Sequence, residues 1–346
     1  MDISHLRQQF LSQNLKILRC PPAKQENTPY IPLLIKVLMV EERCTFPLYL
    51  KVSEGNERKI KYVLYLEEGE ILRRHWMESL ERVGIERVYF HEQDLDRVLA
   101  YLNNHLLLTS SEPEHYPQKF CTLREHLTIS LHRSFKSPKL GANINLAKKS
   151  LGQLANFMDH QGFPWKLVWE MLYRDYTLYN HSVNVALVGM ALMVFLKKPG
   201  RDRLTVGLAG LFHDLGLTQI QEEIVNKIEP LDPEERKILE KHPELGYHLL
   251  KNNPQIPLDS LRLILEHHES ADGSGYPKGL TLFKQHPYTR MLFILEMYDG
   301  LTTFRPYRPA YPPFAALKIL QEQQGKKGPA CEPKTLKLFI QFLALS

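Results

Sequence analysis

The amino-acid sequence predicts an α+β protein: a small N-terminal α+β domain followed by a larger, all-helical domain. Short segments rich in β-branched and aromatic residues alternate with helical patterns over the first hundred residues. A polar, proline-containing stretch follows, and beyond it apolar residues recur at helical spacing almost to the C-terminus. Because 346 residues suit two domains, we expect an N-terminal domain over 1–110, a linker over 111–122 and a helical domain over 123–346.

The N-terminal part contains four predicted strands and two predicted helices. The strand segments carry β-branched and aromatic residues, whereas the helical segments carry apolar residues at helical spacing. Neither a P-loop nor a G-x-G-x-x-G motif occurs in this part, so we predict no chemical site of its own. The strands are expected at 31–40, 46–52, 60–66 and 87–90, and the helices at 71–83 and 95–108.

The C-terminal part is predicted to be helical throughout, without internal repeats or low-complexity tracts. Its most apolar run, 183–196, has about 14 residues and contains Asn184 and Gly189. That run is shorter than the ~20 residues needed to cross a bilayer, so we expect a buried core helix and no membrane span. The helices are expected at 123–136, 143–161, 165–196, 203–215, 233–252, 258–268, 288–303, 315–324 and 333–343.

The composition is ordinary for a globular protein, with 43% hydrophobic and 24% charged residues. The net charge of +5 suits an anionic ligand, and the even spread of Lys and Arg gives no sign of a nucleic-acid-binding arm. The N-terminus lacks the apolar core of a signal peptide, and no CxxC spacing occurs, so we expect a reducing, cytoplasmic location. The four cysteines are Cys20, Cys44, Cys121 and Cys331.

Two adjacent histidines, His267 and His268, are followed by Glu269 and a glycine-rich turn over 272–277. A buried imidazole carries a polar nitrogen that needs a partner, and a metal ion is such a partner. Adjacent helical residues point about 100° apart, which suits two rings converging on a metal cluster from a helix end. Further imidazoles and carboxylates complete a candidate set: His181, His213, Asp214, His242 and Glu296.

Each of these residues has an ordinary structural alternative when taken alone. His181 could be a core histidine bonded to a carbonyl, Asp214 a capping or salt-bridged acid, and His242 a surface residue. Together they place imidazoles on four helical segments beside Asp214, whose two oxygens could bridge two cations. Histidine with carboxylate favours Mn, Fe, Zn or Co, and two such metals ~3.5–4 Å apart could hold a hydroxide and clamp a phosphoester.

The order H…HD…H…HH, with GSGYP after the double histidine, resembles the HD-GYP family of metal-dependent phosphohydrolases in the HD superfamily. The resemblance covers about 175–343 and extends to the segments YNHSVNVA, LFHDLG, KHPELGYHLL and MYDGLTTFRPYR. It implies an all-helical catalytic domain that cleaves cyclic di-GMP to pGpG, GMP or both, in bacterial second-messenger signalling. It also implies two divalent metal ions, iron or manganese.

The resemblance assigns roles by motif position. Asp214 would bridge the metals and serve in catalysis, and Tyr276 of the GYP loop would face the substrate and act at the reaction centre. Arg305 and Arg308 would bind phosphate through charge-assisted hydrogen bonds. The metal ligands that it implies are His181, His213, Asp214, His242, His267, His268 and Glu296.

Three positions depart from the family pattern. Leu217 stands where the HD-x-G-K motif has a lysine that contacts phosphate, and Glu296 stands where the last metal ligand is the first acid of an A-D-x-Y-D run. Thr177 replaces a glutamate that binds a third metal in some members, which favours two metals. Leu217 and Glu296 motivate an alternative: a non-catalytic member that binds metal and cyclic di-GMP and signals through protein partners.

The N-terminal domain is expected to regulate or dock, as accessory domains of this family do. It lacks the acid pair and matching lysine of a phospho-acceptor receiver domain. Its ligand or partner cannot be named from these residues. Exposed helical faces would suit a homodimer.

Overall fold

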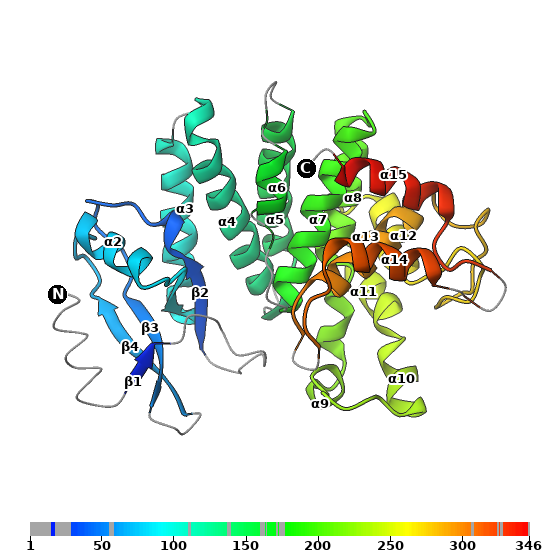
Figure 1. The fold of residues 1–346 in the computed structure, drawn as a ribbon, viewed down its shortest axis with the longest axis horizontal. Coiled ribbons are helices and arrows are strands. Elements are labelled where there is room, and N and C mark those ends of the chain that lie inside the picture. The colour runs from blue at the N-terminus through cyan, green and yellow to red at the C-terminus, as the bar shows by residue number, and fades with distance from the viewer. Residues whose placement is uncertain are drawn as a thin grey trace. The chain divides into compact units, whose positions relative to one another are not determined.

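Figure 1 shows the fold in a computed structural model of the chain. The structure describes residues 15–17, 29–54, 59–109, 112–136, 140–159, 163, 165–170, 172, 177–305, 308–323, 325 and 328–344. The chain forms two compact units, and the division between them falls between Ile129 and Ser130. The two units are described separately below.

The division lies further along the chain than the linker predicted at 111–122. It falls inside helix α4 (Tyr116–Lys136), which begins within that segment. The early turns of α4 carry an apolar stripe at helical spacing, and these side chains are buried. A polar, proline-containing sequence therefore starts a helix here, and the linker at 111–122 stays a prediction. The stripe consists of Tyr116, Phe120, Leu123 and Leu127.

The first unit contains an antiparallel sheet with the strand order β1-β3-β5-β2, and β4 pairs with β3. Two helices, α2 (Arg74–Arg82) and α3 (Leu95–Leu108), accompany the sheet. All four predicted strands are confirmed, although β2 stops at Leu34 and a 3-10 turn follows where the sequence predicted strand to residue 40. The strands are β1 (Leu15–Ile17), β2 (Tyr30–Leu34), β3 (Leu48–Glu54), β4 (Lys59–Leu66) and β5 (Arg87–His91).

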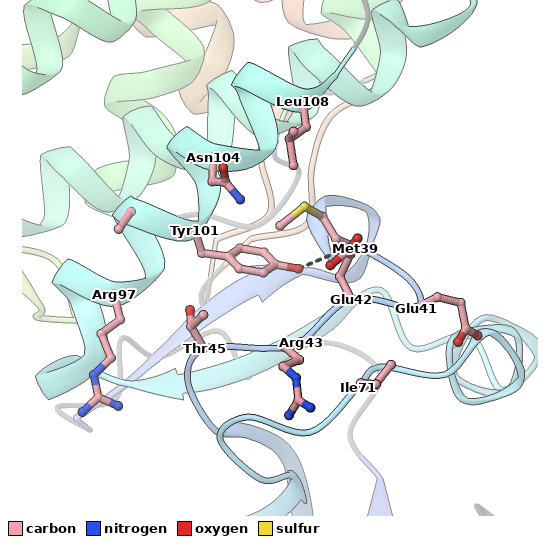
Figure 2. Close-up of a pocket in the computed structure, with 11 residues that line it drawn as sticks. Met39, Glu41, Glu42, Arg43, Thr45, Ile71, Arg97, Tyr101, Asn104 and Leu108 are labelled. Carbon is pink, nitrogen blue, oxygen red and sulfur yellow. Dashed lines mark hydrogen bonds between the residues drawn. The ribbon is translucent and has the colours of Figure 1, made fainter.

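The first unit also has a surface groove of about 570 Å³ between the loop at 39–45 and α3 (Figure 2). Its floor includes Met39 and the buried ring of Tyr101, whose hydroxyl oxygen accepts a hydrogen bond from the Met39 N–H at 2.6 Å. Charged side chains of both signs, Glu42 and Arg43 among them, stand around it. The groove is a feature of the N-terminal unit alone.

The second unit is helical in the part of the chain that the structure describes, as the sequence predicted. Two predicted helices are each divided. The segment 165–196 forms α6 and α7, and the Thr177 hydroxyl caps α7 by accepting the Asn180 N–H at 3.0 Å. The segment 233–252 forms α10 and α11, with Pro243 in the first turn of α11. The helices are α5 (Leu140–Met158), α6 (Lys166–Glu170), α7 (Leu178–Phe195), α8 (Gly200–Phe212), α9 (Glu222–Val225), α10 (Pro233–Leu239), α11 (His242–Leu250), α12 (Leu258–Glu266), α13 (Thr289–Thr302), α14 (Pro313–Glu322) and α15 (Pro333–Leu343).

Helix α7 is the core of the second unit, as expected for the apolar run at 183–196. Among the described residues it alone is long and apolar enough to cross a membrane, and 78% of it is buried by the rest of the protein. Helix α8 crosses α7 so closely that a Cβ atom at Gly210 would collide with the main chain of Ala186. This close crossing brings His181 on α7 near His213 at the end of α8.

Candidate metal centre

The structure brings together the seven predicted ligands. Six come from the ends or first turns of four helices, and one comes from the middle of a fifth. His181 lies in the first turn of α7, and His213 and Asp214 follow the last residue of α8. His242 begins α11, whereas His267 and His268 directly follow α12. Glu296 lies in the middle of α13. Helices that meet end to end in this way aim polar side chains at one buried point.

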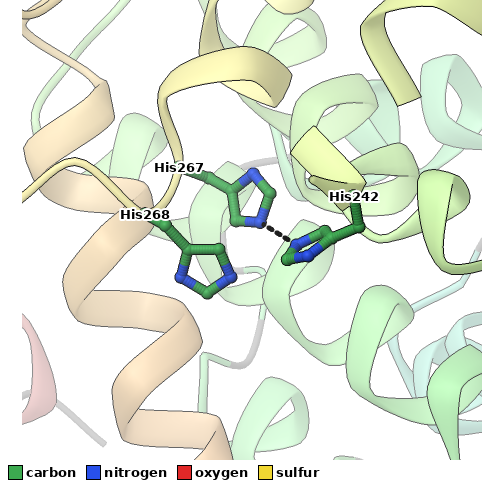
Figure 3. A group of neighbouring side chains, drawn as sticks. All are labelled: His242, His267 and His268. Carbon is green, nitrogen blue, oxygen red and sulfur yellow. Dashed lines mark hydrogen bonds between the residues drawn. The ribbon is translucent and has the colours of Figure 1, made fainter. Parts of the chain in front are cut away.

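The imidazoles form two groups. His181, His213 and Asp214 have ligand atoms within 4.8 Å of one another, and so do His242, His267 and His268 (Figure 3). The Nε2 atoms of His181 and His213 are 3.3 Å apart, and those of His242 and His267 are 3.0 Å apart. With metal–nitrogen bonds of about 2.1 Å, neighbouring ligands of one ion lie roughly 3.0–3.4 Å apart. The spacing therefore fits one ion in each group.

Asp214 lies between the two groups and presents one carboxylate oxygen to each. Its Oδ2 is 3.3 Å from His213 Nε2 and 4.0 Å from His181 Nε2. Its Oδ1 is 3.4 Å from His242 Nε2 and 4.0 Å from His267 Nε2. The two clusters together could therefore hold two ions, with Asp214 between them.

The ring orientations leave Nε2 free to bind metal. The Nδ1–H groups of His213, His242 and His267 face the main-chain carbonyls three residues earlier, at 2.8, 2.8 and 2.7 Å. Since a ring that donates from Nδ1 keeps its lone pair on Nε2, these contacts select the tautomer that a metal needs. Burial requires a partner for that lone pair, because each of these three side chains is at most 3% exposed.

Asp299 is a functional candidate to which the sequence analysis gave no role. Its Oδ2 accepts a hydrogen bond from His181 Nδ1 at 2.6 Å, and its Oδ1 accepts one from the Asn184 side chain at 2.8 Å. It thereby orients His181 as the carbonyls orient the other rings. A sequence signal existed, because Asp299 lies three residues after Glu296 and so shares its helix face.

Glu296 is placed as a ligand would be. Its Oε2 lies 3.5 Å from His268 Nδ1 and is buried without a hydrogen-bond partner among the described residues. Burial raises the pKa of Glu296 to about 8, against an opposing effect of His213. A buried carboxylate oxygen without a partner is costly, and a cation would satisfy it. The donor set therefore fits divalent metal.

Without metal, the pKa values of the site residues shift in different directions. Burial alone would lower the pKa of His213, but the neighbouring Asp214 carboxylate raises it to about 9. Burial would raise the pKa of Asp214, yet His213 and other nearby imidazoles hold it well below its usual range. Burial lowers the pKa values of His242, His267 and His268. His213 is therefore protonated near neutral pH, whereas the rings of His242, His267 and His268 are neutral.

The GYP loop packs on the double histidine. The ring of Tyr276 stacks on His268, with centroids 4.5 Å apart and planes 29° apart. Position 275 must be glycine because the main chain of His268 and Ser270 lies so near that a Cβ atom would collide with it. Glu269, which follows the double histidine, is buried and faces the loop. Its carboxylate accepts the N–H groups of Lys278 and Leu280 at 2.7 and 2.6 Å and so holds the loop.

A second glycine brings His242 to the site. Gly216 follows the His213-Asp214 pair by two residues, and a Cβ atom at this position would overlap the His242 carbonyl. The first turn of α11 therefore rests directly on the main chain after Asp214. Leu217, next in the chain, is half-buried and apolar and provides no cation.

The two arginines predicted to bind phosphate differ in their surroundings. The charge of Arg305 reaches Glu296, whose pKa it lowers against the larger effect of burial. Arg308 donates from its guanidinium to the carbonyls of Gly300, Leu301 and Pro309 at 2.6–3.1 Å. In this structure Arg308 therefore fastens the end of α13, and its role in binding substrate stays a prediction.

Comparison with known proteins agrees with this geometry. Residues 174–329 match the HD domain family. The cyclic di-GMP phosphodiesterase PA4108 of Pseudomonas aeruginosa is 29% identical over 228 residues, covering 65% of this chain and 53% of that protein. The 3'3'-cGAMP-specific phosphodiesterase 3 of Vibrio cholerae is 32% identical over 144 residues, covering 41% of this chain and 31% of that protein. The chain thus spans about half the length of these relatives, or less.

The fold is also similar to a solved structure, that of Bd1817, an HDG"Y"P protein from Bdellovibrio bacteriovorus. The TM-score is 0.67 at 19% identity, and the match covers 91% of this chain and 99% of that one. At this identity the likeness concerns the fold. The chain carries an HD domain that matches the HD-GYP cyclic di-GMP phosphodiesterases, with an N-terminal region outside that domain.

Proposed function

We propose that this protein is a metal-dependent cyclic di-GMP phosphodiesterase that yields pGpG, GMP or both. The observation that carries the proposal is the position of Asp214, whose two oxygens face two separate groups of imidazoles. The 29% identity to a cyclic di-GMP phosphodiesterase supports this choice of substrate. A cytoplasmic location and a regulatory or docking role for the N-terminal unit belong to the same proposal.

The residues of the site would divide the work of holding two ions, for which we propose iron or manganese. His181 and His213 would hold one ion, and His242, His267 and His268 the other. Asp214 would be shared, and Glu296 would complete the set through its buried oxygen. Two such ions, when bound, neutralise charge on the phosphodiester and generate the nucleophile from water at neutral pH.

The remaining side chains would position the substrate. Burial raises the pKa of Tyr276 above its ordinary value, so its hydroxyl stays protonated and can donate a hydrogen bond to a phosphate or departing oxygen. Arg305 would meet phosphate charge beside Glu296. Asp299 keeps the His181 ring aligned while substrate enters.

Turnover of defined substrates tests the proposal. Protein loaded anaerobically with Fe²⁺ or Mn²⁺ is incubated with cyclic di-GMP, and in parallel with 3'3'-cGAMP, and products are separated by chromatography. We expect pGpG or GMP from cyclic di-GMP, and no product from Asp214→Asn protein. Cleavage of 3'3'-cGAMP alone would replace the proposed substrate with that of the Vibrio relative.

The alternative is a non-catalytic receptor, and Leu217 is the observation that favours it. The position has no cation, and its side chain is half-buried and apolar. A receptor would bind two metals and cyclic di-GMP yet release no product under reducing conditions. A Leu217→Lys variant that gains activity would show that the missing charge limits turnover.

A further inference from the structure

A small aromatic pocket lies in the second unit, at the opposite end of α7 from the metal centre. Its volume is about 170 Å³, and its walls come from α6, from the end of α7 and from α15. His181 lies in the first turn of α7 and the pocket at its last residues, so the helix separates them by roughly 20 Å. The pocket is therefore distinct from the candidate metal centre. The residues that line it are Trp165, Trp169, Val194, Phe195, Lys197 and Phe342.

Four of these side chains are aromatic, and Phe342 joins them. The Phe342 side chain is buried, and its ring centroid lies 5.3 Å from that of Trp169 and 5.6 Å from that of Phe195. Trp165 and Trp169 are four residues apart across the first turn of α6, and both are half-buried. The pocket therefore offers flat apolar surface to a ligand, as small-molecule sites commonly do.

The polar side-chain atoms that line the pocket are all hydrogen-bond donors. They are the two indole N–H groups and the Lys197 ammonium, none of which can accept a hydrogen bond. Within the described part of the chain, none of these three groups has a hydrogen-bond or ion-pair partner. Glu170, the acid next to Trp169, already pairs with Lys166 at 3.1 Å. The pocket therefore suits a ligand that carries an anionic acceptor.

Lys197 is held beside the pocket by a backbone conformation that usually belongs to glycine. Its φ is 55°, in the left-handed region. Helix α7 ends here in a Schellman motif, in which the Lys198 N–H donates to the Met193 carbonyl at 2.9 Å and the Lys197 N–H to the Val194 carbonyl at 2.8 Å. Glycine is the usual residue at this position, because a Cβ atom is unfavourable there.

The charge of Lys197 at a helix end does not by itself explain this strained residue. A cation near the C-terminus of a helix is favourable, but Lys198 already supplies one next door without a positive φ. Strained backbone is often found where a side chain must be held for a ligand. At position 197 the strain keeps an ammonium group beside four aromatic rings.

We propose that this pocket binds a monocyclic aromatic carboxylate, with its ring among the aromatic side chains and its carboxylate on Lys197. The size agrees, because a cavity of about 150 Å³ holds one benzene ring. The charge agrees too, because both carboxylate oxygens accept hydrogen bonds and the lining polar side-chain groups donate them. The site is independent of the proposed function.

Tryptophan fluorescence reports on this pocket directly, because two of the three tryptophans in the chain line it. In full-length protein, Trp76→Phe removes the signal from the first unit. This protein is titrated with benzoate, benzyl alcohol and benzylamine, which share one ring and differ in charge. The same titrations are made after adding Lys197→Gly, Lys197→Arg, Trp169→Leu or the matched control Lys198→Ala.

We expect benzoate to bind about tenfold more tightly than benzyl alcohol, and benzylamine to bind most weakly. Lys197→Gly should bring benzoate and benzyl alcohol to equal affinity without lowering the midpoint of thermal unfolding, because glycine adopts this conformation without strain. Lys197→Arg and Lys198→Ala should both keep the preference for benzoate. Trp169→Leu should weaken all three ligands, with Trp165 as the remaining reporter.

Three results would overturn the inference. One is the absence of a fluorescence change up to about 10 mM benzoate. Another is equal affinity for benzoate and benzyl alcohol before Lys197 is changed, which would leave an apolar side chain of a partner protein as the better occupant. The third is an equal loss of the benzoate preference in Lys198→Ala and Lys197→Gly, which would show that Lys197 has no special part in binding.

Discussion

The two halves of the candidate metal centre are oriented by different kinds of group. In the half with His181 and His213, the His181 ring is held by a side chain, the Asp299 carboxylate. In the half with His242 and His267, both rings are held by main-chain carbonyls at helix ends. A side-chain mutation outside the ligands can therefore disturb ring orientation in the first half. In the second half, the main chain fixes the orientation of both rings.

The halves also differ in charge before metal binds. Asp214 raises the pKa of His213 to about 9, while burial lowers the pKa values of His242 and His267. A proton must therefore leave His213 when metal enters the first half, whereas the neutral rings of His242 and His267 release none. The comparison predicts unequal responses to mutation and to pH.

Removing the shared ligand should have the largest effect. Asp214→Ala takes an oxygen from both halves, so we expect less than one bound metal and a fall in cyclic di-GMP turnover of at least about a thousandfold. Metal content by mass spectrometry and product formation check both results. In contrast, His213→Ala should keep the metal of the other half. Two metals retained in Asp214→Ala would refute the bridging role.

Asp299→Asn should lower the metal affinity of the first half only. The amide cannot accept both hydrogen bonds as a carboxylate does, and the loss of an orienting partner costs about 10–100-fold in metal affinity or activity. Competition with a chelator measures the affinity of each site. Asn184 donates to the same carboxylate, so Asn184→Gln serves as a milder control. A loss confined to the second half would contradict the assignment of Asp299.

Metal binding in the first half should depend on pH. His213 is protonated below about pH 9 in the metal-free protein, so each unit of pH lost below that value should weaken binding about tenfold. In the second half the lowered histidine pKa values leave the rings neutral at pH 7. Titrations of His267→Ala and His213→Ala protein between pH 6.5 and 9 isolate the two halves, with roughly one histidine proton released in the first only. Equal slopes would show that the charge difference is absent.

Glu269→Gln should have the smallest effect on chemistry. Its carboxylate accepts two main-chain N–H groups of the GYP loop, and an amide can accept only on its oxygen. The free energy of unfolding should fall by about 1–3 kcal/mol, while metal content stays at two. Denaturant melts and metal analysis check this. Loss of metal without loss of stability would instead give Glu269 a part in the metal site.

Much of this arrangement was predictable from sequence because its parts are local. Helix periodicity located most helices, and motif spacing located the ligands that the structure brings together. The double histidine at the end of α12 converges on the cluster as the 100° helical step suggested. The two glycines of the HD and GYP turns are explained by close approach at Gly216 and Gly275.

The remaining features depend on contacts between distant segments. The bond between Asp299 and His181 joins residues 118 positions apart, and helix periodicity indicates only that Asp299 shares a face with Glu296, not that it meets His181. Arg308 has the sequence position of a phosphate ligand, but its donors fasten the end of α13. The division at 129/130 falls within α4, whose apolar stripe is buried although the segment 111–122 is polar.

Anomalous diffraction from crystals of the manganese-loaded protein tests the binuclear centre most directly. Two peaks are predicted, one beside His181 and His213 and one beside His242 and His267, with one Asp214 oxygen bonded to each. Their separation should be ~3.5–4 Å. A single peak, or two peaks that do not share Asp214, would contradict the central claim.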